Sequence, residues 1–194
     1  MSAEPAHDRA ALAADLAAAL SPDRVRTGGV ELGLYGRDAS VLAGEAAVAC
    51  FPLSTDEVAA AVRTARAHGR PFVARGSGTG LAGGAVPVGD PVVIVTTKMD
   101  RVLSIDPDER VAWVEPGVVN LDLTRALAPY GLHFAPDPSS QQACTIGGNV
   151  ANNSGGPHCL AYGVTSAHVL AVEVVLPDGS VTVLGGLDAE PLVL

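Results

Sequence analysis

Hydrophobic side chains recur with helical spacing in three stretches of this chain. Leucine and alanine follow that spacing through residues 7–20. Ser54 is followed three residues later by Glu57, which is the pattern of a capping box and predicts the start of a second helix. Residues 120–130 form the third stretch, and Asn120 is its expected N-cap. These stretches predict three helices.

Short apolar runs rich in valine and isoleucine predict strands between the helices. Two pairs of runs flank turn sequences, DPD at residues 106–108 and PDG at residues 177–179, so each pair is expected to form a hairpin. The predicted strands are residues 46–51, a short buried strand at 71–74, residues 91–97, the pair 101–106 and 109–114, and the pair 168–176 and 180–184. Residues 30–44 are read as a connector and residues 136–156 as an irregular segment. Helices and strands that interleave with hairpins favour an α+β or mixed α/β fold over a pure doubly wound sheet.

Composition and charge indicate a globular chain that does not bind nucleic acid through a basic surface. The 194 residues are 48% hydrophobic and 17% charged, which excludes a disordered polyelectrolyte and allows one large domain or two small ones. The net charge of −9 repels phosphate backbones, so any anionic ligand must be held by local donors.

The three cysteines, Cys50, Cys144 and Cys159, indicate neither a disulfide framework nor a metal-binding pair. The N-terminus lacks the basic and apolar layout of a signal peptide. No apolar run reaches the roughly 20 residues that span a bilayer. We therefore expect a cytoplasmic protein with no transmembrane segment and no metal site.

Residues 78–83 (GTGLAG) match the pattern G-x-G-x-x-G, but the residues that follow exclude its two common interpretations. Two prolines and a glycine in residues 85–91 prevent the helix that a Rossmann loop opens, and no Gly-Lys-Ser/Thr follows for a Walker A loop. A glycine-rich loop between two strands can instead turn successive N–H groups inward to bind an anion. Glycine would be needed there for a positive φ and for close approach of the backbone. The alternative is an ordinary glycine-rich turn.

A second stretch, residues 144–156 (CTIGGNVANNSGG), holds two glycine pairs and three asparagines, and it follows a stiff PDPSS turn at residues 136–140. Asparagine offers both donors and acceptors, and paired glycines allow a flat ligand to lie against the backbone. A structural loop with Asx turns is the alternative. Because glycine loses much conformational entropy on folding, one ligand that spans both glycine-rich stretches is favoured. Such a ligand would be a dinucleotide with a diphosphate and a flat ring.

Taken together, these blocks resemble the FAD-linked oxidases of the vanillyl-alcohol oxidase or PCMH type, in particular the group of glycolate oxidase and D-lactate dehydrogenase. The blocks that carry the resemblance are residues 71–85, 114–117, 136–140, 144–159, 162–165 and 172–176. The resemblance implies a PCMH-type FAD-binding domain at residues 46–184, made of two α/β subdomains with the cofactor between them. Residues 1–45 would be an N-terminal helix and connector, and residues 185–194 a truncated tail.

The resemblance also implies which residues contact FAD. Residues 75–80 would wrap the diphosphate, residues 136–140 and 145–152 would line the ribityl and isoalloxazine portion, and Val174 would reach the adenosine end through its backbone. The implied residues are Arg75, Gly76, Ser77, Gly78, Thr79, Gly80, Pro136, Asp137, Pro138, Ser139, Ser140, Thr145, Gly147, Gly148, Asn149, Asn152 and Val174. Arg75 could alternatively point outward, and His158 could be a proton relay or simply hydrogen-bonded.

Two departures from the family's pattern shape the expected chemistry. The loop GSGTG at residues 76–80 has no histidine for the covalent link that some relatives make, so we expect non-covalent FAD. A thioether through Cys144 or Cys159 is the alternative. The family's chains continue into a substrate (cap) domain that holds the substrate-binding residues. This chain, truncated before that domain, is expected to be a truncated gene product, a cut fragment or half of a split enzyme, and no catalytic residue carries over.

The activity implied by the resemblance is oxidation of a small 2-hydroxy acid, such as glycolate or D-lactate, by hydride transfer from the substrate Cα to flavin N5. The present chain would supply cofactor binding only. A catalytically silent flavin module that depends on a partner protein is one competing hypothesis, and a non-flavin nucleotide-binding protein is another. The sequence identifies neither the electron acceptor nor a partner.

Overall fold

Residues 6–186 are described by the computed structural model, and the chain divides into two compact units. Unit 1 comprises Met1–Lys98 and Val174–Thr182, and unit 2 comprises Met99–Glu173 and Val183–Leu194. Within residues 6–186, no helix has the length and apolar character needed to cross a membrane.

A four-stranded sheet with the order β1-β2-β4-β3 forms the centre of unit 1. Its strands are β1 (Val25–Arg26), β2 (Val48–Cys50), β3 (Phe72–Arg75) and β4 (Val92–Val95). β4 pairs in parallel with β2 and β3, whereas β1 is antiparallel to β2. The apolar β2 and β4 are fully buried, as central strands of a covered sheet should be. β3 lies at the edge of the sheet and its Phe72 is 36% exposed, so the predicted strand at residues 71–74 exists but is not buried.

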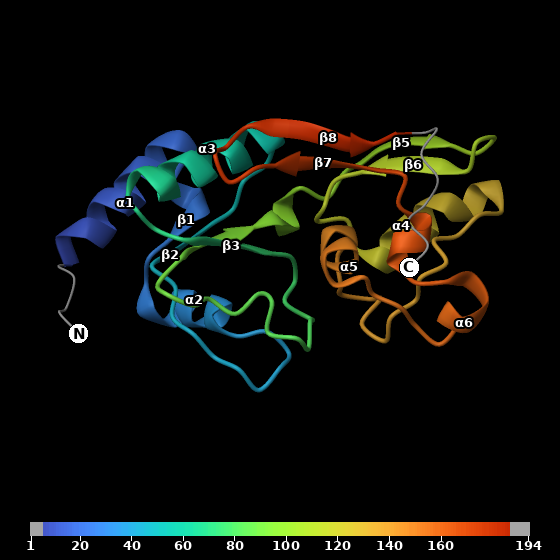
Figure 1. Ribbon diagram of the computed structural model, residues 1–194, viewed down its shortest axis with the longest axis horizontal. Helices are drawn as coiled ribbons and strands as arrows, with labels where there is room; N and C mark the ends of the chain where they lie inside the picture. Colours follow the sequence, from blue (N-terminus) through green and yellow to red (C-terminus); the bar gives the residue numbers. More distant parts are fainter. Residues whose placement is uncertain (1–5, 187–194) are drawn as a thin grey trace. The chain divides into compact units, whose positions relative to one another are not determined.

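Helices cover both faces of this sheet (Figure 1). On one face, α1 (Ala6–Ala19) and α3 (Thr55–Ala67) pack Leu12 and Val62 against β2 and β4. On the other face, α2 (Gly29–Gly33) and the 3-10 turn η2 (Leu34–Gly36) bring Leu32 and Tyr35 to the sheet. The predicted connector at residues 30–44 therefore contains helical structure, because burying these two side chains outweighs the weak local pattern.

Ser54 caps the start of α3 as predicted, and Glu57 reaches back to Leu53, the residue before the cap. The Ser54 hydroxyl accepts a hydrogen bond from the N–H of Glu57 at 3.3 Å, and the Glu57 carboxylate accepts one from the N–H of Leu53 at 2.7 Å. After the helix ends at Ala67, Gly69 adopts a φ of +63°. Both ends of this helix thus follow from local sequence signals.

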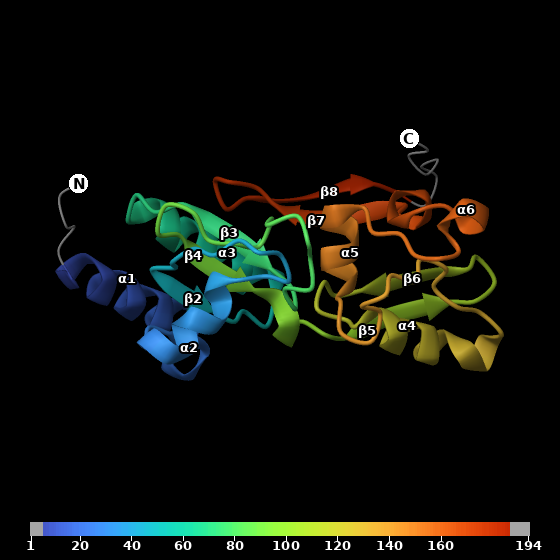
Figure 2. The same ribbon diagram turned by 90° about the horizontal axis from the view of Figure 1, so that it is seen from below.

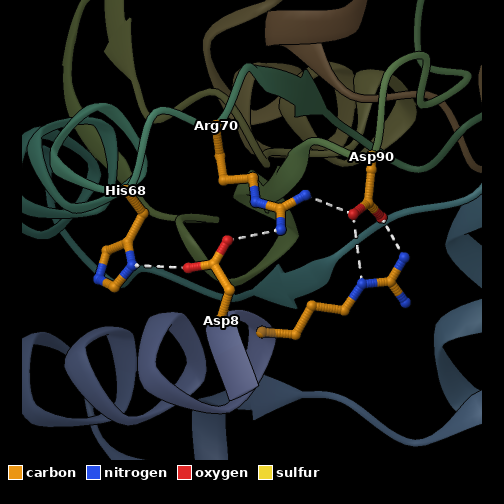
Figure 3. Close-up of polar contacts among 5 residues, drawn as sticks. Asp8, His68, Arg70 and Asp90 are labelled. Atoms are coloured by element: carbon orange, nitrogen blue, oxygen red, sulfur yellow. Dashed lines mark hydrogen bonds and ion pairs between the residues drawn. The ribbon is translucent and has the colours of Figure 1, made fainter. Parts of the chain in front are cut away.

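Ion pairs attach α1 to the rest of unit 1 (Figure 3). Asp8 accepts a hydrogen bond from Arg70 at 2.9 Å, and its other oxygen lies 3.7 Å from Nδ1 of His68. Arg70 also pairs with Asp90 at 2.5 Å, and Asp90 pairs with Arg9 of α1 at 2.7 Å. A helix that precedes the predicted domain at residues 46–184 therefore packs in the same unit as the first strands of that domain.

An antiparallel hairpin and an amphipathic helix form the core of unit 2 (Figure 2). The hairpin strands β5 (Val102–Asp106) and β6 (Val111–Val114) pair as predicted, with one irregularity between Val102 and Ser104. α4 (Asn120–Leu127) packs Leu123 and Leu127 near the hairpin residues. It continues into the 3-10 turn η4 (Ala128–Tyr130), which ends at Gly131 with a φ of +70°.

The remaining elements are short. They are the 3-10 turns η1 (Pro22–Arg24), η3 (Thr96–Lys98) and η5 (Thr165–His168), the helices α5 (Ile146–Asn152) and α6 (Cys159–Tyr162), and the strands β7 (Ala171–Val175) and β8 (Val181–Gly185). β7 and β8 form the second predicted hairpin. Its first strand begins at Ala171 instead of residue 168 because η5 occupies the preceding residues.

Two predictions of local structure in unit 2 are wrong. The segment at residues 136–156 contains the helix α5, which Thr145 caps by accepting a hydrogen bond from the N–H of Gly148 at 3.3 Å. This cap offsets the low helix propensity of the two glycines. Asn120 is the first residue of α4 and not its N-cap, a position that Val119 takes.

Candidate functional site

The glycine-rich loop of unit 1 connects β3 to β4 and contains no helix. Gly78, Gly83 and Gly89 have φ angles of +78°, +75° and +77°, a conformation that other residues rarely adopt. The prediction of a loop between two strands, with glycines at positive φ, is confirmed at these positions.

Four successive N–H groups of this loop, at residues 77–80, donate no hydrogen bond to any acceptor within residues 6–186. A neighbouring group is engaged, because the carbonyl of Gly80 accepts a hydrogen bond from the N–H of Ala39 at 3.1 Å. Residues 77–80 are half-buried or exposed, so these N–H groups are open to water or to a ligand. Residues 77–80 therefore offer a run of donors suited to an anion.

Arg75 lies beneath this loop and does not point outward. It is 8% exposed, and its Nη1 donates to the carbonyl of Arg37 at 2.7 Å. A Cβ added to Gly78 would overlap the Arg75 guanidinium. Burial lowers the pKa of Arg75, and the carboxylate of Asp38 opposes that effect. Arg75 thus supports the Arg37 backbone from inside the unit and leaves no room for a side chain at Gly78.

In unit 2, one side chain joins the two other predicted segments, residues 136–140 and 145–152. The amide of Asn120 donates to the carbonyl of Pro136 at 3.0 Å and to Oδ1 of Asn149 at 2.9 Å. Sequence reasoning missed this role because an asparagine at the start of a helix is usually a cap. No local pattern distinguishes a capping asparagine from one that bridges distant segments.

The glycines of the second stretch are required by packing within unit 2. A Cβ on Gly147 would lie 2.6 Å from the Cβ of Pro116, and one on Gly156 would overlap the carbonyl of Asp137. The N–H of Gly147 donates to the carbonyl of Pro116 at 2.8 Å, and that of Gly148 to the Thr145 hydroxyl. The entropy cost of these glycines is therefore explained by the chain's own contacts, without a ligand.

Asp137 and His158 meet at a pocket of about 280 Å³ in unit 2. Nδ1 of His158 lies 2.5 Å from Oδ2 of Asp137, and this hydrogen bond lowers the pKa of Asp137. His133 and Tyr162 also line the pocket, with their ring centroids 6.3 Å apart. His158 thus has a defined carboxylate partner, which agrees with the interpretation of a simply hydrogen-bonded histidine.

The predicted FAD-contacting residues fall into two groups. Residues 75–80 and Val174 belong to unit 1, and residues 136–152 belong to unit 2. Cys144 is 4% exposed and its sulfur lies 3.3 Å from Nδ2 of Asn149, whereas Cys159 is exposed. Among the described residues, no group of three or more His, Cys, Asp or Glu side chains is arranged to hold a metal ion.

Comparison with protein families identifies the class of this chain. Residues 46–185 match the FAD binding domain family, and the chain belongs to that family. Its cofactor is therefore FAD. The run of unpartnered N–H donors at residues 77–80 fits the diphosphate of that cofactor.

Known relatives are much longer than this chain. The glycolate oxidase subunit GlcD of Escherichia coli (strain K12) is 47% identical over 135 residues, which cover 70% of this chain and 27% of the relative. A D-lactate dehydrogenase of Anaerostipes hadrus is 39% identical over 155 residues, which cover 80% of this chain and 31% of the relative. The chain thus spans less than a third of the length of either protein. The resemblance to this group, predicted from sequence, is confirmed.

The fold also matches a solved structure. The crystal structure of p-cresol methylhydroxylase with substrate bound superposes with a TM-score of 0.79 at 21% identity, covering 92% of this chain and 36% of that chain. At this identity the match establishes the fold alone. The prediction of an α+β, PCMH-type FAD-binding fold is confirmed.

Proposed function

We propose that this chain is the FAD-binding part of an oxidoreductase that oxidises a small 2-hydroxy acid of the glycolate or D-lactate type. The observation that carries the cofactor role is the run of N–H donors without partners at residues 77–80. The substrate class is inferred from the names of the two relatives above. When bound, FAD would accept a hydride at N5 from the α-carbon of such an acid.

The residues of the chain would act by binding and orienting the cofactor. The N–H groups of residues 77–80 would hold the diphosphate, which the net charge of −9 otherwise repels. Arg75 would leave no room for a side chain at Gly78 and also remains a proposed phosphate contact. Residues 136–140 and 145–152 would line the ribityl and isoalloxazine portion, and Val174 would meet the adenosine end.

The bound FAD would be non-covalent. Residues 76–80 contain no histidine, and the Cys144 thiol is buried against Asn149. A thiol with that burial is a packing group unless the segment around it moves. The exposed Cys159 is the alternative attachment point. The three cysteines are free, which supports a reducing location such as the cytoplasm.

In this proposal the chain supplies cofactor binding and does not oxidise the acid by itself. Holding a carboxylate substrate near N5 requires fixed cationic donors. Of the buried arginines, Arg24 and Arg70 are already engaged with protein carboxylates, and Arg75 is proposed to contact the phosphate. The residues that hold the substrate would lie outside this chain, in a longer protein or a partner protein.

A genetic experiment tests the proposed substrate class. Extracts of the source organism would be assayed for dye reduction with glycolate, with D-lactate and with a 3-hydroxy acid as control. Deletion of the gene should abolish the signal with one 2-hydroxy acid, and the intact gene should restore it while a Gly78→Val copy does not. Unchanged dye reduction with every 2-hydroxy acid tried would contradict the proposal.

A further inference from the structure

Asn120 is a buried side chain that touches two of the proposed flavin-binding segments without belonging to either. It is 1% exposed at the first position of α4. Nδ2 donates to the carbonyl of Pro136, which opens the PDPSS turn, and to Oδ1 of Asn149, which lies in α5. Both N–H bonds of one amide are thereby used to connect Pro136 and Asn149, which are 13 positions apart in sequence.

Backbone hydrogen bonds from the same turn of α4 reinforce this connection. The N–H of Asn120 donates to the carbonyl of Cys144 at 3.0 Å, and the N–H of Leu121 donates to the carbonyl of Gln141 at 3.0 Å. Asn149 in turn donates from Nδ2 to the sulfur of Cys144 at 3.3 Å. The start of α4 therefore fixes the PDPSS turn, the segment after it and α5 to one another.

Helix formation does not explain an asparagine at this position. Val119 is the N-cap, and no side chain caps the helix. Oδ1 of Asn120 is buried without a hydrogen-bond partner among the described residues, which is costly for an amide oxygen. An apolar residue would avoid that cost, whereas only a group with two N–H bonds can bridge Pro136 and Asn149.

We propose that Asn120 is a positioning residue of the flavin site, and that its amide sets the spacing between the PDPSS turn and α5. The inference rests on the proposed function, because it assumes that both segments contact FAD. Loss of the Asn120 amide should therefore weaken FAD binding by the folded protein, in addition to any effect on the stability of unit 2. An asparagine that served stability alone would change unfolding without changing the affinity of the folded protein.

The test compares Asn120→Ala with Thr165→Val in the whole chain. Thr165 is also fully buried in unit 2, where its hydroxyl donates to the carbonyl of Ser154 at 2.7 Å, but it joins neither proposed segment. FAD dissociation constants would be measured by fluorescence quenching below the melting temperature of each apoprotein. We expect Asn120→Ala to raise the Kd about tenfold or more, because the PDPSS turn and α5 lose their fixed spacing, while Thr165→Val stays within about twofold of the parent.

Two further variants test whether the NH2 group of Asn120 and its bond to Asn149 determine the affinity for FAD. Asn120→Asp keeps the shape of the side chain but loses the NH2 group, so it should also weaken FAD binding and serves if the alanine variant does not fold. The double variant Asn120→Ala with Asn149→Ala should lose less affinity for FAD than the sum of the two single losses, because both substitutions remove the same Asn120–Asn149 hydrogen bond. A change in the visible circular dichroism of bound flavin in Asn120→Asp would support altered positioning.

The outcomes separate this inference from the proposed function. If the parent binds FAD and folded Asn120 variants bind it equally well, the positioning role is wrong and the proposed function stands. Equal loss of affinity in Thr165→Val would also overturn the role, because any buried polar defect would then suffice. If the parent itself binds no FAD, the proposed function fails and this inference fails with it.

Discussion

Gly78 and Gly84 lie in the same loop, yet a side chain would meet different surroundings at the two positions. Gly78 has a φ of +78° and faces the Arg75 guanidinium, whereas a Cβ on Gly84 would meet nothing within 4 Å. Gly78→Val should therefore raise the Kd for FAD about 30-fold, equivalent to about 2 kcal/mol, through strain and displaced N–H donors. Gly84→Val should leave it within about twofold. Fluorescence quenching measures both Kd values. Equal values for the two variants would show that this loop does not bind the diphosphate.

Glu115 provides a test of electrostatics in unit 2. Its carboxylate is nearly buried and accepts hydrogen bonds from the N–H of Arg101 at 2.8 Å and from Nη2 of Arg101 at 2.6 Å. The side-chain bond from Arg101 is the main reason that the pKa of Glu115 lies below its usual value. A depressed carboxyl pKa stabilises the fold above the unfolded value of about 4.3, and this contribution is lost as the pH falls through the folded pKa.

We therefore expect Glu115→Gln to lower the melting temperature at pH 7, and the gap from the parent to close as the pH falls below about 4. Differential scanning calorimetry across pH would measure this gap. Exposed Glu109 supplies the control, since Glu109→Gln should show little change at any pH. A gap for Glu115→Gln that persists unchanged in acid would mean that the hydrogen-bonded carboxylate is not its origin.

Single residues show where sequence reasoning succeeds and where it stops. The Ser54 cap and the positive φ of Gly78 follow from local rules, and the structure confirms both. The roles of Asn120 and Arg75 depend on partners at Pro136, Asn149 and Arg37 that only the folded chain brings near. Sequence patterns identify residue types suited to a task, but they do not specify long-range partners.

At the level of elements, α1 shows that unit 1 extends beyond the family match that begins at residue 46. Leu16 is fully buried among residues of α3, β2 and β4. Leu16→Ala should lower the free energy of unfolding by about 2–4 kcal/mol, because it leaves a cavity in that core. Urea unfolding monitored by circular dichroism would measure the change.

The ion pair between Arg9 of α1 and Asp90 provides a control for Leu16→Ala, measured as the same free energy of unfolding. Arg9 is half exposed and pairs with Asp90, so Arg9→Ala should cost about 1 kcal/mol or less. Equal small effects of the two substitutions would indicate that α1 is not part of the cooperative core of unit 1.

Element predictions failed where tertiary contacts overrule local preference. Residues 146–152 read as an irregular glycine-rich loop, but the Thr145 cap and the contact of Gly147 with Pro116 make them helical. β3 was located correctly, yet its burial depends on its place in the strand order, which the local pattern does not specify. The hairpin at residues 102–114 was predicted well because its turn lies within the segment.

For the whole molecule, the mass of the denatured polypeptide distinguishes non-covalent from covalent attachment of FAD. Acid precipitation of the FAD-loaded chain should release intact FAD and leave a polypeptide of unmodified mass, because residues 76–80 offer no histidine and Cys144 is buried. Mass spectrometry of the denatured protein checks this. A mass increased by one flavin, lost in Cys144→Ser or Cys159→Ser, would identify a thioether instead.

We propose that this chain binds FAD with its own residues and recognises the diphosphate through the loop at residues 77–80. The most direct measurement is a calorimetric titration of the apoprotein with FAD, and in parallel with FMN, which has a single phosphate and no adenosine. We expect one saturable site for FAD and binding of FMN that is at least about tenfold weaker. Absence of saturable FAD binding by the folded chain, or FMN binding as tight as that of FAD, would contradict this proposal.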